Sequence, residues 1–274
     1  MKLGREIVRG VGLGVLAMGT CVFAQQPAEG TADGGITLQL QGQNPKQTLT
    51  AGKTGRAAAP FDLTGYWVAV INEDWRWRMM TPPKGDFSSV PLNLEGRRAA
   101  DQWDRVKDEA AGEQCRVYGA PSLMRLPTRL HITWTDDDTL KIETDAGTQT
   151  RLLHFGAAPA EGKRSWQGSS VAAWEAEVGA PKRGGGPTGP RDLKVVTTSL
   201  RAGYLRRNGI PFSENTLLTE YFDLFPKLSN GDEWLVVTAI VDDPQYLTER
   251  YITSSNFKRE PDAAKWHPAP CATR

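Results

Sequence analysis

Short segments in which apolar and polar residues alternate recur along most of the chain. This period of two is typical of β-strands that bury one face and expose the other. The segments with this pattern are rich in β-branched or aromatic residues, and they are 66–71, 75–80, 129–135, 140–143, 149–155, 165–167, 171–175, 193–198, 216–223, 234–241 and 251–257. Their number predicts a mainly β fold with a single antiparallel sheet that is either closed into a barrel or strongly curved.

One helix is expected near 94–104. Asn93 suits the N-cap position, Glu95 follows in the first turn, and Leu94, Ala99 and Trp103 supply apolar positions. We expect this helix to cover or plug the sheet.

The first residues have the three parts of a secretory signal peptide. Positive charges at Lys2, Arg5 and Arg9 precede a short apolar run, which ends in a small-x-small sequence at Ala24. We therefore expect residues 1–24 to be removed by cleavage near Ala24 and the protein to be periplasmic or secreted. The apolar run is shorter than the roughly 20 residues that a membrane span needs, so no membrane span is predicted.

The rest of the chain divides by composition. Residues 25–60 are polar and poor in large apolar side chains, which is typical of a disordered linker, whereas residues 61–274 carry the strand signals of a β-barrel domain. The chain has 33 basic and 32 acidic residues, and loss of three basic and one acidic residue with the signal peptide leaves 30 and 31. This balance gives no support for nucleic-acid binding. Nothing in the sequence predicts the oligomeric state.

Two cysteines, Cys115 and Cys271, remain after the predicted cleavage. A periplasmic or extracellular compartment permits their oxidation. We predict that they form a disulfide bond, which would join the C-terminal segment to the segment before the central strands and stabilise the fold by closing a long loop.

Two of the three histidines lie among charged residues in the segment 129–155. A hairpin through 136–138 would place His131 directly opposite Glu143, with Cβ atoms roughly 4.5–5.5 Å apart. A carboxylate at that distance holds an imidazole in one tautomer and makes it more basic. We therefore predict that His131 is a general base and that Glu143 orients it.

The turn at Gly147 decides which residue accompanies this pair. A two-residue loop would place His154 on the face of His131, whereas a bulge at Gly147 would place Arg151 there. The Ala-Gly sequence favours Arg151, which would stabilise developing negative charge, and Tyr118 is a candidate acid. The alternative for the whole face is that it is the solvent-exposed side of an antiparallel sheet.

Tryptophan and arginine alternate in the segment 75–78. Trp75 and Trp77 would form an aromatic face of the predicted strand, and Arg76 and Arg78 a basic one. The aromatic face would belong to the core or, with Trp134, would line a pocket for a flat apolar or sugar-like ligand. With the opposite polarity, the two arginines would face a cavity and bind an anionic group.

The residues FDLTGYWVAVI, with Gly65, Tyr66 and Trp67 at their centre, resemble the start of lipocalin-like barrels, in which a Gly-x-Trp element marks the first strand. The order of DLTGYW, PSLMRLP, HITW, SWQGSSVAAWE and LKVVTT is similar to that in a family of secreted bacterial proteins without an assigned activity. This resemblance covers most of the chain from 61 to 257. It implies a small calycin-type barrel and transfers no catalytic residue.

Motifs of metal and nucleophilic catalysis are missing from the sequence. It contains no HExxH, paired CxxC or Gly-x-Ser-x-Gly, and its three histidines are far apart, so no metal site or cofactor is predicted. The alternative is a zinc site of His131, His154 and one carboxylate, which requires the two-residue loop at Gly147. The first predicted function is a periplasmic or secreted barrel that binds a small apolar or aromatic molecule in a Trp-lined cavity. The alternative is a cofactor-free lyase, isomerase or hydrolase that uses His131 and Glu143 in the same cavity. A structural role in the cell envelope is a third possibility.

Overall fold

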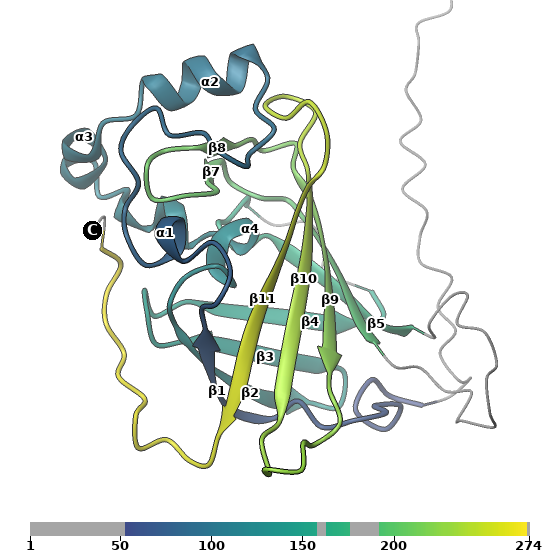
Figure 1. Cartoon of the computed structure of the whole chain (residues 1–274). Coiled ribbons are helices and arrows are strands. Elements are labelled where there is room, and N and C mark those ends of the chain that lie inside the picture. Colours follow the sequence, from purple (N-terminus) through teal and green to yellow (C-terminus); the bar gives the residue numbers. More distant parts are fainter. Residues whose placement is uncertain (1–52, 158–162, 176–191, 273–274) are drawn as a thin grey trace, which may run out of the picture. The chain divides into compact units, whose positions relative to one another are not determined.

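A closed β-barrel is the main feature of the computed structural model, which describes residues 53–157, 163–175 and 192–272 (Figure 1). Around the wall, the strands follow the order β1, β11, β10, β9, β6, β5, β4, β3 and β2. The predicted β-barrel is therefore confirmed. The predicted signal peptide at 1–24 and most of the predicted linker at 25–60 lie outside the described residues. Within the described residues, no helix has the length and apolar character that would let it cross a membrane.

Nine strands form the barrel wall. They are β1 Gly65–Val70, β2 Arg129–Asp136, β3 Thr139–Thr144, β4 Thr150–Phe155, β5 Ser169–Glu175, β6 Asp192–Thr198, β9 Leu217–Leu224, β10 Trp234–Asp242 and β11 Tyr251–Glu260. Neighbouring strands are antiparallel except β4 and β5, which pair in parallel and so depart from the antiparallel arrangement that was predicted throughout. The predicted strand at 165–167 is not formed, because Ser165 makes only a single bridge with Leu200.

The alternating pattern of the strands fills the barrel interior. Trp67, Leu130, Ile132, Phe222 and Phe257 face inward and have no exposed surface, so no water-sized space touches them. Full burial of such a side chain contributes about 1.5–3 kcal/mol to the free energy of unfolding. The barrel interior is therefore packed with side chains.

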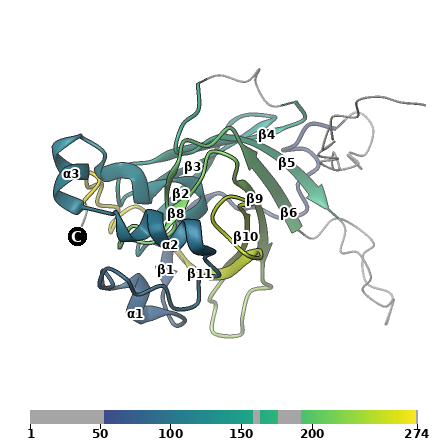
Figure 2. The same cartoon turned by 90° about the horizontal axis from the view of Figure 1, so that it is seen from above.

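Short elements cover one end of the barrel (Figures 1 and 2). They are α1 Trp75–Arg78, α2 Leu94–Asp101, α3 Arg105–Ala110, η1 Gln114–Tyr118, α4 Ala120–Leu123, β7 Gly203–Tyr204 and β8 Pro211–Phe212, and we call them the cap. Helix α2 is the predicted helix, and the Asn93 side chain accepts a hydrogen bond from Gly96 N at 2.8 Å, as an N-cap does. The view from above shows α2 lying over the barrel end (Figure 2).

The strand predicted for 75–80 is wrong, because this segment contains helix α1. Asp74 has a φ of 51° and turns the chain, and its carbonyl oxygen accepts hydrogen bonds from Trp77 N at 2.9 Å and Arg78 N at 3.0 Å. Arg78 forms an ion pair with Glu73, and its Nε donates to Arg125 O at 2.8 Å. Contacts with a distant segment thus override the local alternation.

The C-terminal segment returns from β11 to the cap. The predicted disulfide is present, with the Cys115 and Cys271 sulfur atoms 2.00 Å apart. Nearby, Gly147 N donates to Ala269 O and Ala269 N donates to Asp145 O, both at 2.8 Å. The segment is therefore tied both to η1 and to the turn between β3 and β4.

The described chain contacts the barrel before Phe61. Gly55 N donates to Asp138 Oδ1 at 2.6 Å, and Trp174 Nε1 donates to Gly55 O at 2.7 Å. These two bonds hold residues near Gly55 against the ends of β3 and β5.

Candidate functional site

His131 and Glu143 meet as predicted, on the outer face of the barrel. The two residues are directly opposite each other in β2 and β3, and His131 Nδ1 lies 3.3 Å from Glu143 Oε2. The adjacent Leu130 faces the core, so these side chains face outward, where 27% and 31% of their surface is exposed. The imidazole stacks on the Tyr66 ring at 4.3 Å, and Lys141 Nζ lies 3.0 Å from Glu143 Oε2. Glu143 is therefore shared between two cations when His131 is protonated.

The turn between β3 and β4 sets the register that the sequence left open. Gly147 and Thr148 both have positive φ, at 79° and 51°. Two consecutive left-handed residues are not the single bulge that was favoured, and Glu143 pairs with Thr150. The favoured bulge at Gly147 would have paired Glu143 with Gln149 and placed Arg151 on the face of His131, and this prediction is therefore wrong.

This register separates Arg151 from the histidines. His154 shares the outer face with His131, whereas Arg151 points into the barrel, where its surface is 1% exposed. There its Nη1 and Nη2 bind Glu220 Oε1 and Oε2 at 3.0 and 2.5 Å, and Nη2 also contacts Thr197 Oγ1 at 3.3 Å. Arg151 and Glu220 thus form a buried, bidentate ion pair inside the wall.

Tyr118, the predicted acid, is bound to the C-terminal segment. Its hydroxyl donates to Ala272 O at 3.2 Å and accepts from Ala272 N at 3.1 Å. The residues predicted for catalysis consequently lie in three places: on the outer face, in the barrel interior and beneath the C-terminal segment.

The predicted ligand-binding residues separate in the same way. Trp75 is 60% exposed on α1, and the Arg76 side chain is 67% exposed beside Asp86. Trp134 packs against Phe155, with ring centroids 5.4 Å apart. The other two predicted ligand-binding residues, Trp77 and Arg78, face a cavity under the cap.

Trp77 and Arg78 line a small cavity under the cap, of about 20 Å³. Four arginines share its lining, which is unusual because a single buried charge is already costly. The side chains around the space are Trp77, Arg78, Val117, Ser122, Arg125, Leu126, Leu205, Arg206, Arg207 and Tyr251. We call this space the arginine cavity.

Three separate parts of the cap bring these arginines together. Arg78 is the last residue of α1, and Arg125 follows α4. Arg206 and Arg207 lie in the turn between β7 and β8, which is closed by a hydrogen bond from Leu205 N to Ile210 O at 2.7 Å.

The turn between β7 and β8 is anchored to the loop before α2. Asn208 Nδ2 donates to Pro83 O at 3.1 Å and to Asp86 O at 3.0 Å, and Arg206 Nη1 donates to Ser88 O at 2.6 Å. Gly209, with a φ of 81°, provides the left-handed position that the turn needs. These contacts hold the two arginines against the cavity.

Several guanidinium N–H groups at the cavity are buried without a hydrogen-bond partner. Arg78 is 4% exposed and Arg206 is 6% exposed, yet the Nη2 atom of each has no partner among the described residues, and neither has Arg207 Nε. A buried donor without a partner loses its hydration and gains nothing in return, at a cost of about 1–3 kcal/mol and more for a charged group. The cavity therefore has donors to offer to a ligand.

Positive charge at the cavity exceeds the negative charge beside it. Arg78 and Arg125 share the carboxylates of Glu73 and Asp74. Within the described part of the chain, Arg206 and Arg207 form no ion pair, and Arg206 instead lies over the Trp77 ring, 5.0 Å from its centroid. Two formal positive charges thus remain without a carboxylate.

The pKa shifts at the cavity have the direction expected for crowded cations. Burial, followed by the charge of Arg125, lowers the pKa of Arg78 to about 10. Burial also lowers the pKa of Arg207. At pH 7 the Arg78 guanidinium is still protonated, so the cavity carries positive charge that an anion would stabilise.

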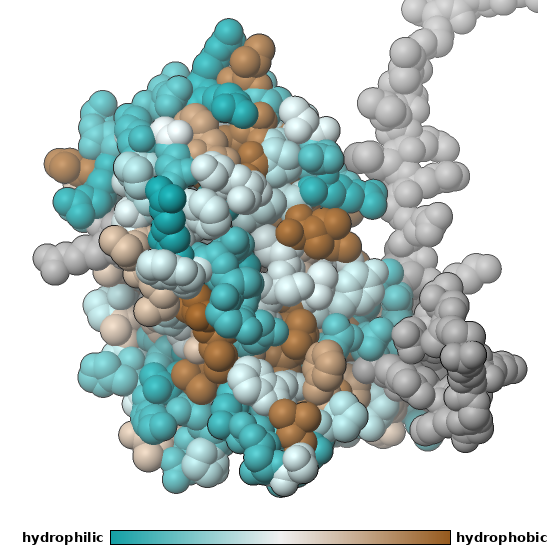
Figure 3. All heavy atoms as spheres, viewed as in Figure 1, coloured by the Kyte–Doolittle hydropathy of each residue, from teal (hydrophilic) through white to brown (hydrophobic). Residues whose placement is uncertain are grey.

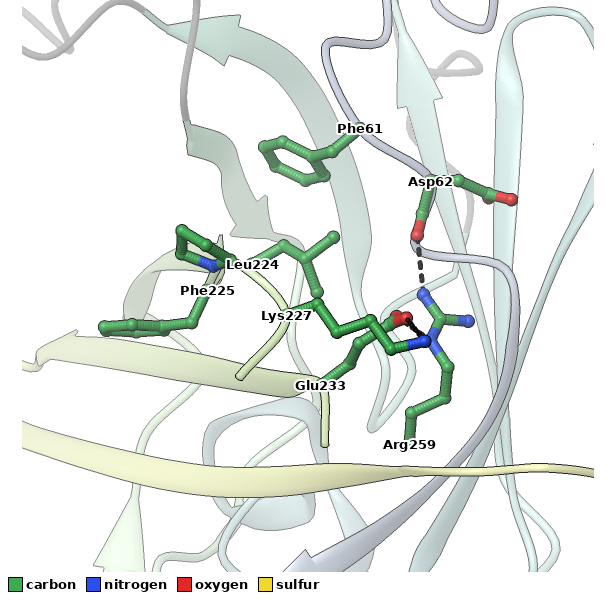
Figure 4. A pocket seen from close by; sticks show the side chains of 8 residues that line it. Phe61, Asp62, Leu224, Phe225, Lys227, Glu233 and Arg259 are labelled. Carbon is green, nitrogen blue, oxygen red and sulfur yellow. Dashed lines mark hydrogen bonds and ion pairs between the residues drawn. The ribbon is translucent and has the colours of Figure 1, made fainter. Parts of the chain in front are cut away.

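A second, larger hollow lies at the end of the barrel opposite the cap, and its charged side chains pair with one another (Figure 4). It measures about 610 Å³, and Arg259 and Lys227 extend into it. Arg259 donates to Glu233 Oε2 at 2.5 Å and to Asp62 O at 2.8 Å, and Lys227 Nζ lies 3.7 Å from Glu233 Oε1. Its cations already have partners within the protein, so its larger volume alone does not make it a better candidate binding site than the arginine cavity.

Neither the surface in Figure 3 nor the metal-ligating side chains among the described residues indicate a further candidate site. On the face in Figure 3, apolar residues form separate groups among hydrophilic ones. Across the described residues, no cluster of three or more His, Cys, Asp or Glu side chains could hold a metal ion.

Arg125, Arg206 and Arg207 were not identified from the sequence. Asn208 and Gly209 form an Asn-Gly pair, a turn signal that could have placed the two preceding arginines at a hairpin tip. Their burial, however, depends on contacts with the loop near Pro83, which no local pattern encodes.

A comparison with protein-family models, curated proteins and solved structures finds no match to this chain. The arginine cavity is therefore the candidate site on the basis of its geometry and charge.

Proposed function

We propose that this protein is a β-barrel that binds a small organic molecule through a carboxylate group in the arginine cavity. The observation that carries the proposal is the set of buried guanidinium N–H groups on Arg78, Arg206 and Arg207 that have no partner among the described residues.

Charge supports an anionic ligand. Burial of an uncompensated ion costs several kcal/mol, and an anion in hydrogen-bond contact offsets that cost. Hydrogen bonds between guanidinium groups and carboxylates are short and about twice as strong as neutral ones. The free protein thus carries an energetic penalty that a bound anion removes.

Size favours a carboxylate over larger oxyanions. The cavity of about 20 Å³ has room for about one water molecule. A carboxylate is flat and offers two oxygens with about four lone-pair sites, enough for three N–H donors. A carboxylate is larger than one water molecule, so the side chains around the cavity must move apart to admit it, and the bulkier sulfate and phosphate would require a larger movement.

The remaining walls support an organic, partly apolar ligand. Trp77, Leu205 and Tyr251 line the same space as the arginines. An aromatic and aliphatic wall beside a few polar groups is typical of small-molecule sites. This agrees with the expected small apolar or aromatic ligand and adds a charged head group to it.

The test compares acids with their neutral amides. Thermal unfolding and calorimetric titration of the full chain at constant ionic strength would use acetate, propionate and benzoate, with acetamide and benzamide as controls. We expect the acids alone to raise the melting temperature, because a ligand of the folded state stabilises it.

Two variants make this test specific. Arg206→Gln should lose the effect of the acids, and Arg250→Gln should keep it, since Arg250 is an exposed arginine with its own partner, Asp242. Equal stabilisation of Arg206→Gln and the unaltered protein, or none of either, would contradict the proposal.

A second candidate function is a cofactor-free lyase, isomerase or hydrolase with His131 as the general base. The 3.3 Å contact between His131 Nδ1 and Glu143 Oε2 favours it. We would assay a panel of nitrophenyl esters with the unaltered protein and with His131→Gln. Faster hydrolysis by the unaltered protein supports this candidate, and equal rates oppose it.

A further inference from the structure

We infer that the ligand is a carboxylic acid with a hydrogen-bond donor next to the carboxylate and an aromatic ring that lies in a groove of the cap. This inference rests on the proposed function, because it places the carboxylate in the arginine cavity and extends the ligand from there.

Three spaces follow one another through the cap. The arginine cavity shares Val117 and Arg207 with a second space of about 10 Å³. That connecting space shares Trp103 and Tyr204 with a surface groove of about 310 Å³. The shared side chains make the three spaces neighbours, so a ligand with its head group in the arginine cavity would extend through the connecting space toward the groove.

The groove suits a flat, uncharged ring. Trp103, Tyr204 and Tyr246 supply aromatic surface, and a volume of about 310 Å³ lies at the small end of ligand sites, which span roughly 300–1,000 Å³. Aromatic rings prefer offset or edge-to-face contact with other rings.

Charges in the groove are already matched. Asp108 Oδ1 lies 3.2 Å from Arg116 Nη1, and Asp108 Oδ2 accepts a hydrogen bond from the Tyr204 hydroxyl at 2.8 Å. Burial raises the pKa of Tyr204, so its hydroxyl stays protonated and remains a donor. A charged ligand body would disturb this pairing, whereas an aromatic ring would not.

The connecting space contains one unused acceptor. Gln114 lines it, and the Oε1 atom of this side chain is buried and has no partner in the described part of the chain. A hydroxyl or N–H group between the carboxylate and the ring would donate to this oxygen. The ligand therefore has three parts that match three spaces in order.

Tyr204 separates the connecting space from the groove. Its ring lies 4.4 Å from the Arg116 guanidinium, and its hydroxyl is held by Asp108. Because the connecting space is small, the Tyr204 side chain must turn when a ring passes from the groove toward the arginines. Tyr204 is thus a positioning residue at the entrance.

The test is a calorimetric series with the full chain and four acids: acetate, lactate, 3-phenylpropionate and 3-phenyllactate. We expect 3-phenyllactate to bind at least about tenfold more tightly than lactate, the gain expected from burying a ring. We also expect it to bind about tenfold more tightly than 3-phenylpropionate, which lacks the hydroxyl group.

Substitutions in the groove and in the connecting space test which of the two provides each gain in affinity. Tyr246→Ser, which lies in the groove and not in the connecting space, should reduce the advantage of 3-phenyllactate over lactate and leave the affinity for lactate unchanged. Gln114→Leu should remove the advantage of 3-phenyllactate over 3-phenylpropionate. Circular dichroism and thermal melting would establish that each variant is folded.

The possible outcomes separate this inference from the proposed function. Equal affinities for lactate and 3-phenyllactate, both lost in Arg206→Gln, would overturn the inference and leave the carboxylate site standing. No binding of any of the four acids would overturn both.

Discussion

Arg78, Arg206 and Arg207 bring positive charge into a part of the fold where charge is costly. Their N–H groups at the arginine cavity are buried and have no hydrogen-bond partner among the described residues. Side chains that served only to hold the fold together would be expected to use these donors within the protein. A ligand that completes the hydrogen bonds gives a physical reason for the arrangement.

Arg207 allows this interpretation to be tested by stability. Methionine at this position keeps the aliphatic volume and removes a charge without an ion-pair partner among the described residues. We expect Arg207→Met to raise the free energy of unfolding by about 1 kcal/mol and to lower the affinity for acetate at least about tenfold. Urea denaturation and calorimetry would measure the two effects.

Arg259 provides the matched control for Arg207. Its guanidinium is satisfied by Glu233, by backbone oxygens and by the face of Trp67. Arg259→Met should therefore lower the free energy of unfolding and leave acetate binding unchanged. Destabilisation by both substitutions would show that Arg207 has a structural role.

The pKa of Arg78 predicts how binding depends on pH. Because this pKa is lowered to about 10 in the free protein, Arg78 is charged at neutral pH and loses its proton as the pH rises through that value. A carboxylate favours the charged form, so its affinity should be constant from pH 7 to 9 and fall above about pH 10. Calorimetry with acetate would show the change, and Arg78→Met should bind weakly at every pH.

The strands were predictable because each repeats the same simple rule. Alternation in β2 and β3 also placed His131 opposite Glu143, as the structure confirms. The same rule failed at 75–78, where a left-handed Asp74 and the distant Arg125 produce a helix instead. It also failed at the turn after β3, since positive φ at a threonine, Thr148, is not signalled by the sequence.

The candidate site was predictable only in part. Trp77 and Arg78 were identified as ligand-binding residues, and an anionic ligand was one of two alternatives for the arginines. The remaining arginines could not be assigned, because their burial arises from contacts among α1, α4 and the β7–β8 turn rather than from any one of these elements.

An ion pair inside the barrel links three strands. Arg151 on β4 binds Glu220 on β9 and Thr197 on β6. Removal of one partner leaves a buried charge uncompensated, so Glu220→Gln should lower the free energy of unfolding by about 3–5 kcal/mol. Urea denaturation would measure the loss.

The double variant Arg151→Met/Glu220→Leu tests the cause of this loss. It removes both charges and should recover most of the stability. A double variant as unstable as Glu220→Gln alone would show that the loss comes from packing rather than from charge.

The β7–β8 turn can be perturbed at one glycine. A Cβ atom at Gly209 would lie 2.1 Å from the Trp103 ring, and the φ of 81° disfavours any side chain. Gly209→Ala should therefore move the turn, lower the free energy of unfolding by about 1–3 kcal/mol and weaken acetate binding at least about tenfold.

Gly231 supplies the matched control for the turn. It has a similar φ of 86°, and a Cβ atom there would have only Lys227 within reach, at 3.9 Å. Gly231→Ala should carry the backbone strain without any effect on binding. Loss of binding in both variants would indicate a general loss of structure.

The whole molecule divides its tasks between a packed wall and a cap that carries the proposed site. The disulfide joins η1 of the cap to the C-terminal segment, which is bonded to the β3–β4 turn. Cys115 and Cys271 are 156 residues apart, so the bond closes most of the folded chain into one loop.

Loss of this bond should lower stability without removing the fold of the wall. We expect Cys115→Ser/Cys271→Ser to lower the free energy of unfolding by roughly 2–5 kcal/mol. Calorimetric melting would measure the change. Two reactive thiols in the denatured, non-reduced protein, or an unchanged melting temperature, would contradict this expectation.

A crystal structure of the complex with 4-bromophenylacetate tests the central claim most directly, because bromine identifies the ligand by its anomalous signal. We predict carboxylate oxygens within about 3.2 Å of Nη2 of Arg78, Nη2 of Arg206 or Nε of Arg207. A complex in which the arginine cavity holds only water, with the carboxylate bound elsewhere, would contradict the account.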